Sequence, residues 1–121
     1  MRDKYEMVVI GGGPAGLGAA LSALENGLER ILIVERDVEL GGILNQCIHN
    51  GFGLHYFKQE LTGPEYAGRL IESLEGSGID VVCDTMVLAI VPAERGQGVC
   101  LMSAAEGYRL VETETLVLAM G

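Results

Sequence analysis

The sequence predicts an α/β fold, in which a parallel β-sheet is built from strands that alternate with helices. Continuous apolar runs at residues 8–10 and 31–34 flank a run of small and apolar residues at 17–24. A third run, at residues 79–83, is apolar except for Asp80 and follows a second segment with helical spacing. Apolar runs without polar alternation are typical of strands that are buried on both faces of a parallel sheet. The first strand, helix and strand should therefore form a right-handed crossover unit.

Composition indicates a single compact domain. The chain has 121 residues, of which 49% are hydrophobic, and its 18 glycines suit tight turns and close packing of helices on a sheet. This length is sufficient for a hydrophobic core, and the apolar content argues against disorder. The net charge of −9 argues against a nucleic-acid partner.

Apolar stretches and cysteines bear on cellular location and metal binding. No apolar stretch reaches the roughly 18 residues that a membrane span needs, and residues 1–6 are too charged for a secretory signal. Cys47, Cys83 and Cys100 fit no zinc-site spacing, and an odd number of cysteines in such a chain indicates reduced thiols. We therefore expect a cytoplasmic protein without a membrane span or a metal site.

A glycine-rich turn joins the first strand to the first helix. The run Gly11-Gly12-Gly13-Pro14-Ala15-Gly16 follows the first apolar run, and Glu35 lies nineteen residues after Gly16, at the end of the second. A strand, a glycine turn and a helix in this order, with an acid after the next strand, are typical of dinucleotide binding. A glycine-rich turn without a ligand is the structural alternative.

Three glycines of this turn have a predicted role. Gly11 permits the tight turn out of the strand, Gly13 lets the main chain approach a pyrophosphate, and Gly16 lets the helix pack against the first strand. The unpaired N–H groups at the start of the helix would face the phosphates. Glu35 would accept hydrogen bonds from ribose hydroxyls, unless it is an ordinary solvated acid at a strand end.

A long segment without clear periodicity, residues 36–61, follows the second strand. Connections of this length in a compact domain are usually functional or disordered, and this one is too apolar to be simply disordered. Gly41 and Gly42 would let the backbone approach the ribose and phosphate, or would only form a turn. A capping box of Thr62 and Glu65, with Pro64 in the first turn, then predicts the start of the second helix.

The pattern changes after the third strand. Short strands at residues 86–91, 97–103 and 108–111 are separated by turns that contain glycine or proline, which predicts an antiparallel meander. Residues 115–119 then form a last buried strand.

This order of elements resembles the N-terminal FAD-binding part of the pyridine nucleotide-disulfide oxidoreductase superfamily, the two-dinucleotide-binding flavoproteins. Three motifs carry the resemblance: residues 11–16 with Glu35, the pair Gly41-Gly42, and residues 114–121, where Met120 takes the place of a usual threonine. The resemblance implies a Rossmann-like parallel sheet of order 3-2-1-4, with helices on one face and the three-stranded antiparallel meander on the other. Residues 115–119 would be left as an open edge through which the chain could self-associate.

The resemblance also implies a set of FAD-binding residues. Val87 would contact adenine through its main chain, and is equally compatible with a core position. Arg36 would pack beside the adenine or the ribose, or would be a surface charge. The full set comprises Gly11, Gly13, Pro14, Ala15, Gly16, Glu35, Arg36, Gly41, Gly42, Val87, Ala119 and Gly121, of which the last two would close over the pyrophosphate.

Cys47 is the one candidate catalytic residue. Disulfide reductases of this superfamily have two cysteines four residues apart after the glycine pair, whereas Cys47 has no such partner, so a dithiol mechanism is not expected. Cys47 is either a reactive thiol near the flavin or a small buried hydrophobe. His49 and His55 are either acid–base groups or ordinary loop histidines, and the other two cysteines should lie in the core.

The predicted function is that of the FAD-binding part of an NAD(P)/FAD-dependent oxidoreductase. In the whole enzyme, flavin would carry hydride or electrons between a nicotinamide or small substrate and an acceptor. Residues 1–121 would be one partial domain that lacks its C-terminal remainder, without turnover and with weak or lost FAD binding. The segment after Gly42 looks closest to flavoproteins of amine-, proline- and opine-oxidising complexes and of glycerol 3-phosphate oxidation. The alternatives are an NAD(P)-binding Rossmann dehydrogenase domain and a non-catalytic flavoprotein-like subunit of an electron-transfer complex.

Overall fold

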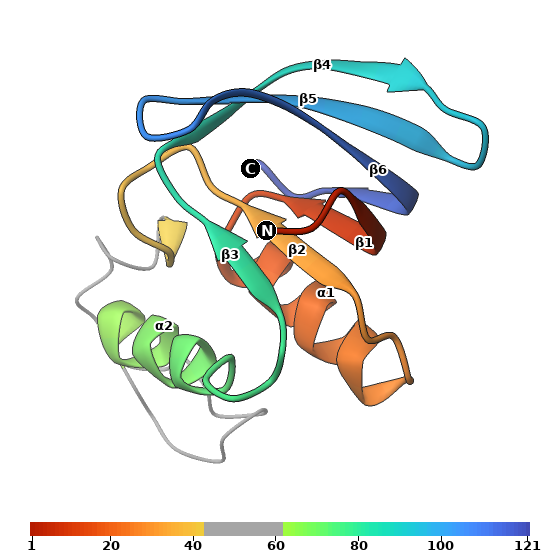
Figure 1. The fold of residues 1–121 in the computed structure, drawn as a ribbon. Coiled ribbons are helices and arrows are strands. Elements are labelled where there is room, and N and C mark those ends of the chain that lie inside the picture. The colour runs from red at the N-terminus through yellow and green to blue at the C-terminus, as the bar shows by residue number, and fades with distance from the viewer. Residues whose placement is uncertain (43–61) are drawn as a thin grey trace.

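The computed structural model describes residues 1–42 and 62–121. The described strands form one six-stranded sheet in the order β3-β2-β1-β6-β5-β4, and both helices lie on one side of it (Figure 1). In chain order the elements are β1 (Lys4–Ile10), α1 (Pro14–Glu25), β2 (Ile31–Val34), α2 (Gly63–Glu72), β3 (Asp80–Val82), β4 (Thr85–Pro92), β5 (Gln97–Ser103) and β6 (Gly107–Leu118).

One half of the sheet is parallel and consists of β3, β2, β1 and the end of β6. Residues 7–10 of β1 lie in register with residues 31–34 of β2 on one side and with residues 115–118 of β6 on the other. The predicted order of third, second, first and last strand is therefore confirmed. A buried cluster holds α1 and α2 against this half; it includes Val9, Leu17, Leu21, Ile31, Ile33 and Leu70.

The other half of the sheet is the predicted antiparallel meander, in which β5 pairs with β4 and with β6. The strands predicted separately at residues 108–111 and 115–119 are one continuous strand, β6. Thr113, which lies between them, stays extended because its backbone pairs with both β1 and β5, and its hydroxyl donates to the Thr115 carbonyl oxygen at 2.8 Å. Because β6 belongs to both halves, the sheet is mixed and unbroken.

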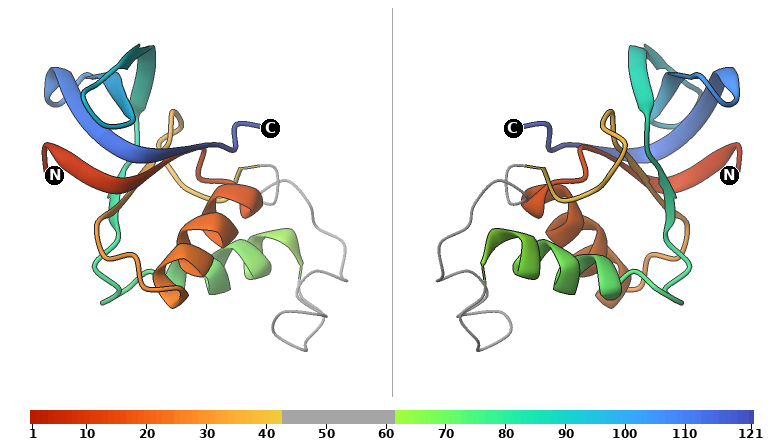
Figure 2. Two further views of the ribbon diagram at one scale, coloured as in Figure 1. Left: turned by 90° about the vertical axis from the view of Figure 1, so that its right-hand side faces the viewer. Right: turned by 90° about the vertical axis from the view of Figure 1, so that its left-hand side faces the viewer.

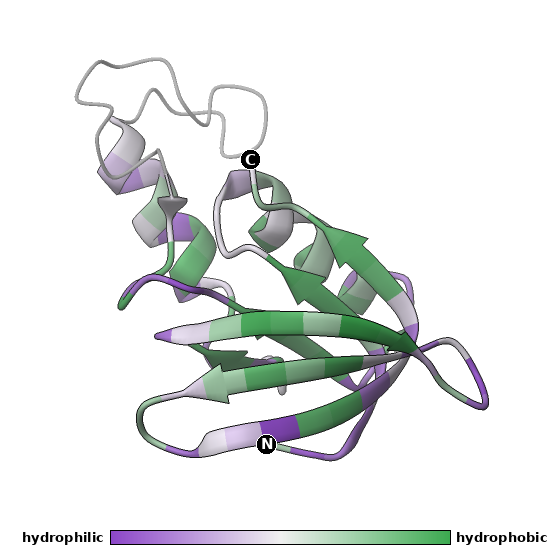
Figure 3. Cartoon of the chain, turned by 90° about the horizontal axis from the view of Figure 1, so that it is seen from above, coloured by the Kyte–Doolittle hydropathy of each residue, from purple (hydrophilic) through white to green (hydrophobic). Residues whose placement is uncertain are grey.

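The sheet curls, so that the meander covers the face of the parallel half that the helices leave open (Figure 2). A second buried cluster fills the space between them, with Tyr5, Val8, Ile10, Leu32 and Val34 from the parallel strands and Val99, Leu101 and Val111 from the meander. The prediction of helices on one face and a meander on the other is thus confirmed. Apolar residues accordingly dominate the strands that face the core (Figure 3).

The start of α1 packs directly on the end of β1 because two glycines have no side chains. A Cβ atom on Gly16 would overlap the carbonyl oxygen of Gly11, and a Cβ on Gly11 would overlap that of Ala119. Gly11 also has a φ of +113°, a conformation that other residues rarely adopt. These two positions therefore fix where the helix begins relative to β1 and β6.

The second helix begins at the capping box that the sequence predicts. The Thr62 side chain accepts the Glu65 N–H at 3.3 Å, and the Glu65 carboxylate accepts the Thr62 N–H at 3.0 Å. This hydrogen bond from the Thr62 backbone holds the pKa of Glu65 below its usual value. The reciprocal bonds satisfy donors that the first turn of the helix cannot pair internally.

The predicted open edge is restricted to one side of a short segment. The sheet ends at β3 and β4, and β6 lies inside it. The pairing of β5 with β6 stops at Thr113, however, so among the described residues the segment 115–118 has β1 on one side and no strand on the other.

Two alanine substitutions in α1 test the helix contact. Gly16→Ala is expected to lower the free energy of unfolding by about 3 kcal/mol, because the new methyl group forces the helix away from β1. Gly18→Ala is the matched control, since nothing lies within 4 Å of a Cβ at that position; it should stabilise the protein by about 1 kcal/mol. Denaturant unfolding followed by circular dichroism measures both. Equal effects would show that Gly16 does not limit the helix position.

Candidate functional site

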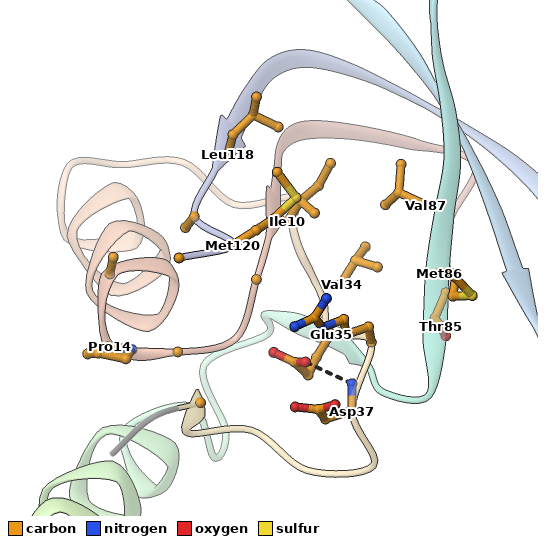
Figure 4. Close-up of a pocket in the computed structure, with 17 residues that line it drawn as sticks. Ile10, Pro14, Val34, Glu35, Asp37, Thr85, Met86, Val87, Leu118 and Met120 are labelled. Carbon is orange, nitrogen blue, oxygen red and sulfur yellow. Dashed lines mark hydrogen bonds between the residues drawn. The ribbon is translucent and has the colours of Figure 1, made fainter. Parts of the chain in front are cut away.

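A cavity of about 810 Å³ opens at the carboxyl ends of the parallel strands. Ile10, Val34 and Leu118, which end β1, β2 and β6, line it together with the glycine-rich turn and the start of β4 (Figure 4). In open α/β sheets, this edge is where ligands bind. The lining residues are Ile10, Gly11, Gly13, Pro14, Ala15, Val34, Glu35, Arg36, Asp37, Gly42, Thr85, Met86, Val87, Leu118, Ala119, Met120 and Gly121.

The glycine-rich turn divides its N–H groups between the protein and the cavity. The Gly11 N–H donates to the Val34 carbonyl oxygen at 2.8 Å, and the Gly12 N–H donates to the Glu35 carboxylate at 2.8 Å. Within residues 1–42 and 62–121, the N–H groups of Gly13, Ala15 and Gly16 have no acceptor, and of these residues Gly13 and Ala15 line the cavity. Gly13 is the N-cap of α1 and Ala15 lies in its first turn, where the positive end of the helix favours anions such as phosphates.

Glu35 is a buried carboxylate beside this turn. Glu35 as a whole is 6% exposed, and its side chain extends from the end of β2 to line the cavity (Figure 4). One carboxylate oxygen accepts the Gly12 N–H and the other accepts the Asp37 N–H, both at 2.8 Å. A carboxylate oxygen has a second lone pair, so Glu35 retains the capacity to accept further hydrogen bonds from a ligand.

The wall opposite the helix is formed by the start of β4. The chain turns between β3 and β4 at Asp84, which has a φ of +50° and donates its N–H to the Asp37 carbonyl oxygen at 2.8 Å. The Thr85 N–H donates to the Glu35 carbonyl oxygen at 3.1 Å. These bonds hold β4 beside the end of β2, with Val87 directed toward the cavity and Met86 directed away from it (Figure 4).

The structure brings most of the sequence-predicted binding residues together on this cavity. Two of them lie behind it instead. Gly16 is buried against the Gly11 carbonyl group, and Gly41 is buried and donates its N–H to the Gly12 carbonyl oxygen at 2.8 Å. Their contribution is therefore to the shape of the turn. Cys47, His49 and His55 lie outside the described residues.

Several lining residues were not predicted from the sequence. Ile10, Val34 and Leu118 could have been found from the rule that ligands meet the carboxyl ends of parallel strands. Asp37 lies two residues after the predicted acid, and its exposed side chain adds a second carboxylate to the cavity. Thr85, Met86 and Met120 lie within two residues of predicted ones, and no local pattern distinguishes them.

Cys83 follows the end of β3 and is only partly buried, so the predicted core position is wrong for this cysteine, and it does not line the cavity. Partial burial raises the pKa of its thiol, and the negative charge of Glu35 raises it further. Cys100 is buried in β5, in agreement with the predicted core position. Among the residues that the structure describes, no cluster of three or more acidic, histidine or cysteine side chains could hold a metal ion. The described helices are too short or too polar to cross a membrane.

Comparison with known proteins shows what the chain is similar to. A family model described as FAD dependent oxidoreductase matches residues 6–80. Hydrogen cyanide synthase subunit HcnB of Pseudomonas protegens is 32% identical over 94% of this chain and 24% of its own length. A subunit of opine oxidase from Agrobacterium tumefaciens is 29% identical over 100% of this chain and 24% of its own length. The chain thus spans about a quarter of these two relatives.

A solved structure of a known reductase has a similar fold. Thioredoxin reductase from Streptococcus pyogenes superposes with a TM-score of 0.77 at 25% sequence identity. The superposition covers 100% of this chain and 36% of that protein.

The pH dependence of alkylation tests the surroundings of Cys83. The thiolate is the reactive form, so the raised pKa should move the midpoint of iodoacetamide modification to higher pH in the folded protein than in urea. Glu35→Gln should move this midpoint back part of the way, because burial remains. Mass spectrometry of the Cys83 peptide measures the reaction separately from the other cysteines. Glu25→Gln, whose charge does not act on Cys83, is the control; an unchanged midpoint in Glu35→Gln would contradict the prediction.

Proposed function

The chain belongs to the family of FAD-dependent oxidoreductases, and from this premise we propose that its cavity binds FAD with the pyrophosphate at the start of α1. The observation that supports this most is the presence, in one cavity, of unpaired N–H groups at a helix N-terminus and of a buried carboxylate. The first suits a diphosphate, and the second suits ribose hydroxyls. FAD requires both at the same edge of the sheet.

The lining residues fit the adenosine diphosphate half of the cofactor. Gly13 has a φ of −82° and a ψ of −169°, and a Cβ built on it would meet only the Gly42 Cα, at 3.8 Å, so space for a phosphate lies beside it. In our proposal Gly13, Pro14 and Ala15 surround the pyrophosphate, Glu35 binds the ribose, and the Val87 main chain meets adenine. Arg36 then packs near the adenine or the ribose, and Gly42, Ala119 and Gly121 border the phosphates.

The activity of the whole protein is a further proposal. Bound FAD supplies hydride- and electron-transfer chemistry, while the protein binds and orients it. We propose an oxidoreductase in which electrons pass between a nicotinamide or small substrate and an acceptor, with NAD(P) as the second cofactor. Residues 1–121 form one partial FAD-binding domain in this proposal. The chain by itself is expected to show no turnover and to bind FAD only weakly.

Two alternative functions are also proposed, and the observations support the first more than the second. A non-catalytic role in a multi-subunit electron-transfer complex is supported by the two relatives from hydrogen cyanide synthase and opine oxidase, because each is a subunit of its enzyme. An NAD(P)-binding dehydrogenase domain has less support, because such a domain would continue with further strand–helix units where this chain forms the β4–β6 meander. A cytoplasmic location is also proposed, and the free thiols of Cys83 and Cys100 are consistent with it.

Gly13→Ala separates ligand binding from folding. The methyl group enters open space in a conformation that any residue can adopt, so the unfolding temperature should change by no more than about 2 °C. The same methyl group occupies the position that the phosphate approaches, so FAD should bind at least about tenfold more weakly. Titrations of the wild type and the variant with FAD, and in parallel with NADH, measure the two affinities. Tighter binding of NADH than of FAD would favour the dehydrogenase alternative, and FAD binding that is unaffected by Gly13→Ala would place the cofactor elsewhere.

Self-association through the unpaired side of residues 115–118 is proposed as well, since unpaired strand edges recruit other strands. Sedimentation velocity over a range of concentrations should reveal dimers or larger species. Thr115→Lys, which adds a charge to this exposed position, should shift the distribution toward the monomer. Ser22→Lys makes a comparable change on the exposed face of α1 and should have no such effect. A wild-type protein that is monomeric at all concentrations would refute the proposal.

A further inference from the structure

The carboxylate of Glu35 connects two segments of the chain that are separate in sequence. One oxygen accepts the N–H of Gly12, in the glycine-rich turn, and the other accepts the N–H of Asp37, in the loop after β2. Both distances are 2.8 Å, and the Glu35 residue is only 6% exposed. Charge-assisted hydrogen bonds in such surroundings are stronger than neutral ones, so this bridge is a substantial restraint on both segments.

Both backbone polar groups of Gly12 are hydrogen-bonded within the protein. While the Gly12 N–H is bound by Glu35, the Gly12 carbonyl oxygen accepts the Gly41 N–H at 2.8 Å. The next residue, Gly42, lies so near that a Cβ on it would be 3.1 Å from the Gly13 Cα. The loop of residues 36–42 is therefore folded back onto the glycine-rich turn, and Glu35 is the side chain that joins the two.

We infer that Glu35 is a positioning residue for the phosphate-facing turn, in addition to any bond that it makes to the ribose. By fixing the Gly12 peptide, its carboxylate sets the orientation of Gly13 and of the first N–H groups of α1. This inference rests on the proposed function for the identity of the ligand, because it concerns how the turn is prepared for a diphosphate. A preformed turn binds its ligand without the cost of ordering the loop.

Charge alone predicts the opposite effect from positioning. The negative charge of Glu35 lies in the same cavity as the proposed phosphates, so a purely electrostatic change would make anions bind more tightly once this charge is removed. If Glu35 only bound ribose hydroxyls, its loss would weaken the binding of ADP and would leave the binding of a diphosphate without those hydroxyls unchanged. Loss of the bridge instead leaves at least one of the two N–H donors unpaired, which loosens the turn and weakens the binding of any diphosphate.

The test uses the full 121-residue chain with Glu35→Gln, which cannot accept from two N–H donors through two carboxylate oxygens. The probes are ADP, 2′,3′-dideoxy-ADP and inorganic pyrophosphate, titrated by NMR. The inference expects Glu35→Gln to weaken all three by about tenfold. Weaker binding of ADP alone would mean that Glu35 acts on the ribose only, and tighter pyrophosphate binding would mean that its charge dominates; either result overturns the inference. Glu25→Gln is the control, since it removes an exposed carboxylate at the end of α1, outside the cavity lining.

Hydrogen exchange in the free protein provides a second measurement that needs no ligand. In the wild type, the Gly12 and Asp37 amides should exchange as slowly as the Gly11 amide, which is bound to the Val34 carbonyl oxygen. In Glu35→Gln, whose amide keeps only one acceptor oxygen, at least one of these two amides should exchange at least about tenfold faster, with Gly11 as the internal reference. Unprotected Gly12 and Asp37 amides in the wild type would overturn the inference even if the variant failed to fold. If no probe binds to the wild type, the proposed function fails, and the exchange rates still decide the role of Glu35.

Discussion

The structure depends on the direct contact between the first turn of α1 and the end of β1. A side chain at Gly16 would overlap the Gly11 carbonyl group, and a side chain at Gly11 would overlap that of Ala119. Because neither is present, the helix N-terminus, the end of β1 and the end of β6 converge at one point. This convergence directs the unpaired N–H groups of the helix into the cavity and lets the last residues of β6 border it. The helix position therefore decides which N–H groups the cavity offers to an anion.

Within the turn, hydrogen bonds are divided between structure and ligand. The N–H groups of Gly11 and Gly12 bind the Val34 carbonyl group and the Glu35 carboxylate, so they stabilise the turn and do not face a ligand. The donors left over are the N–H of Gly13 and those of the first residues of α1. A turn that is held by its own neighbours loses little conformational freedom when a ligand arrives. The acid at the end of β2 consequently has a structural role that the spacing of the motif does not reveal.

The opposite wall is a consequence of how the two halves of the sheet are joined. Since β6 pairs with β1 over its end and with β5 over its beginning, the meander curls over the free face of the parallel strands and buries a second apolar cluster. The curl brings β4 next to β2, and the backbone bonds from Asp84 and Thr85 to the loop after β2 secure it there. The positive φ at Asp84 is a local cost of about 1 kcal/mol that this arrangement offsets.

The sequence by itself determined the elements and the approximate place of the site, and the family resemblance carried by its motifs implied the strand order of the parallel half. Continuous apolar runs, glycines that must lack a Cβ and a capping box at Thr62 are local patterns, and each has a direct physical meaning for burial or backbone conformation. Tertiary structure alone decided that β6 is continuous through Thr113, that Gly41 supports the turn from behind, and that Asp37 and Met120 border the cavity. It also decided that Glu35 bridges two N–H groups. These features depend on strand register and on hydrogen-bond partners far apart in the chain, and a local pattern of residues specifies which groups are buried without specifying which of them meet.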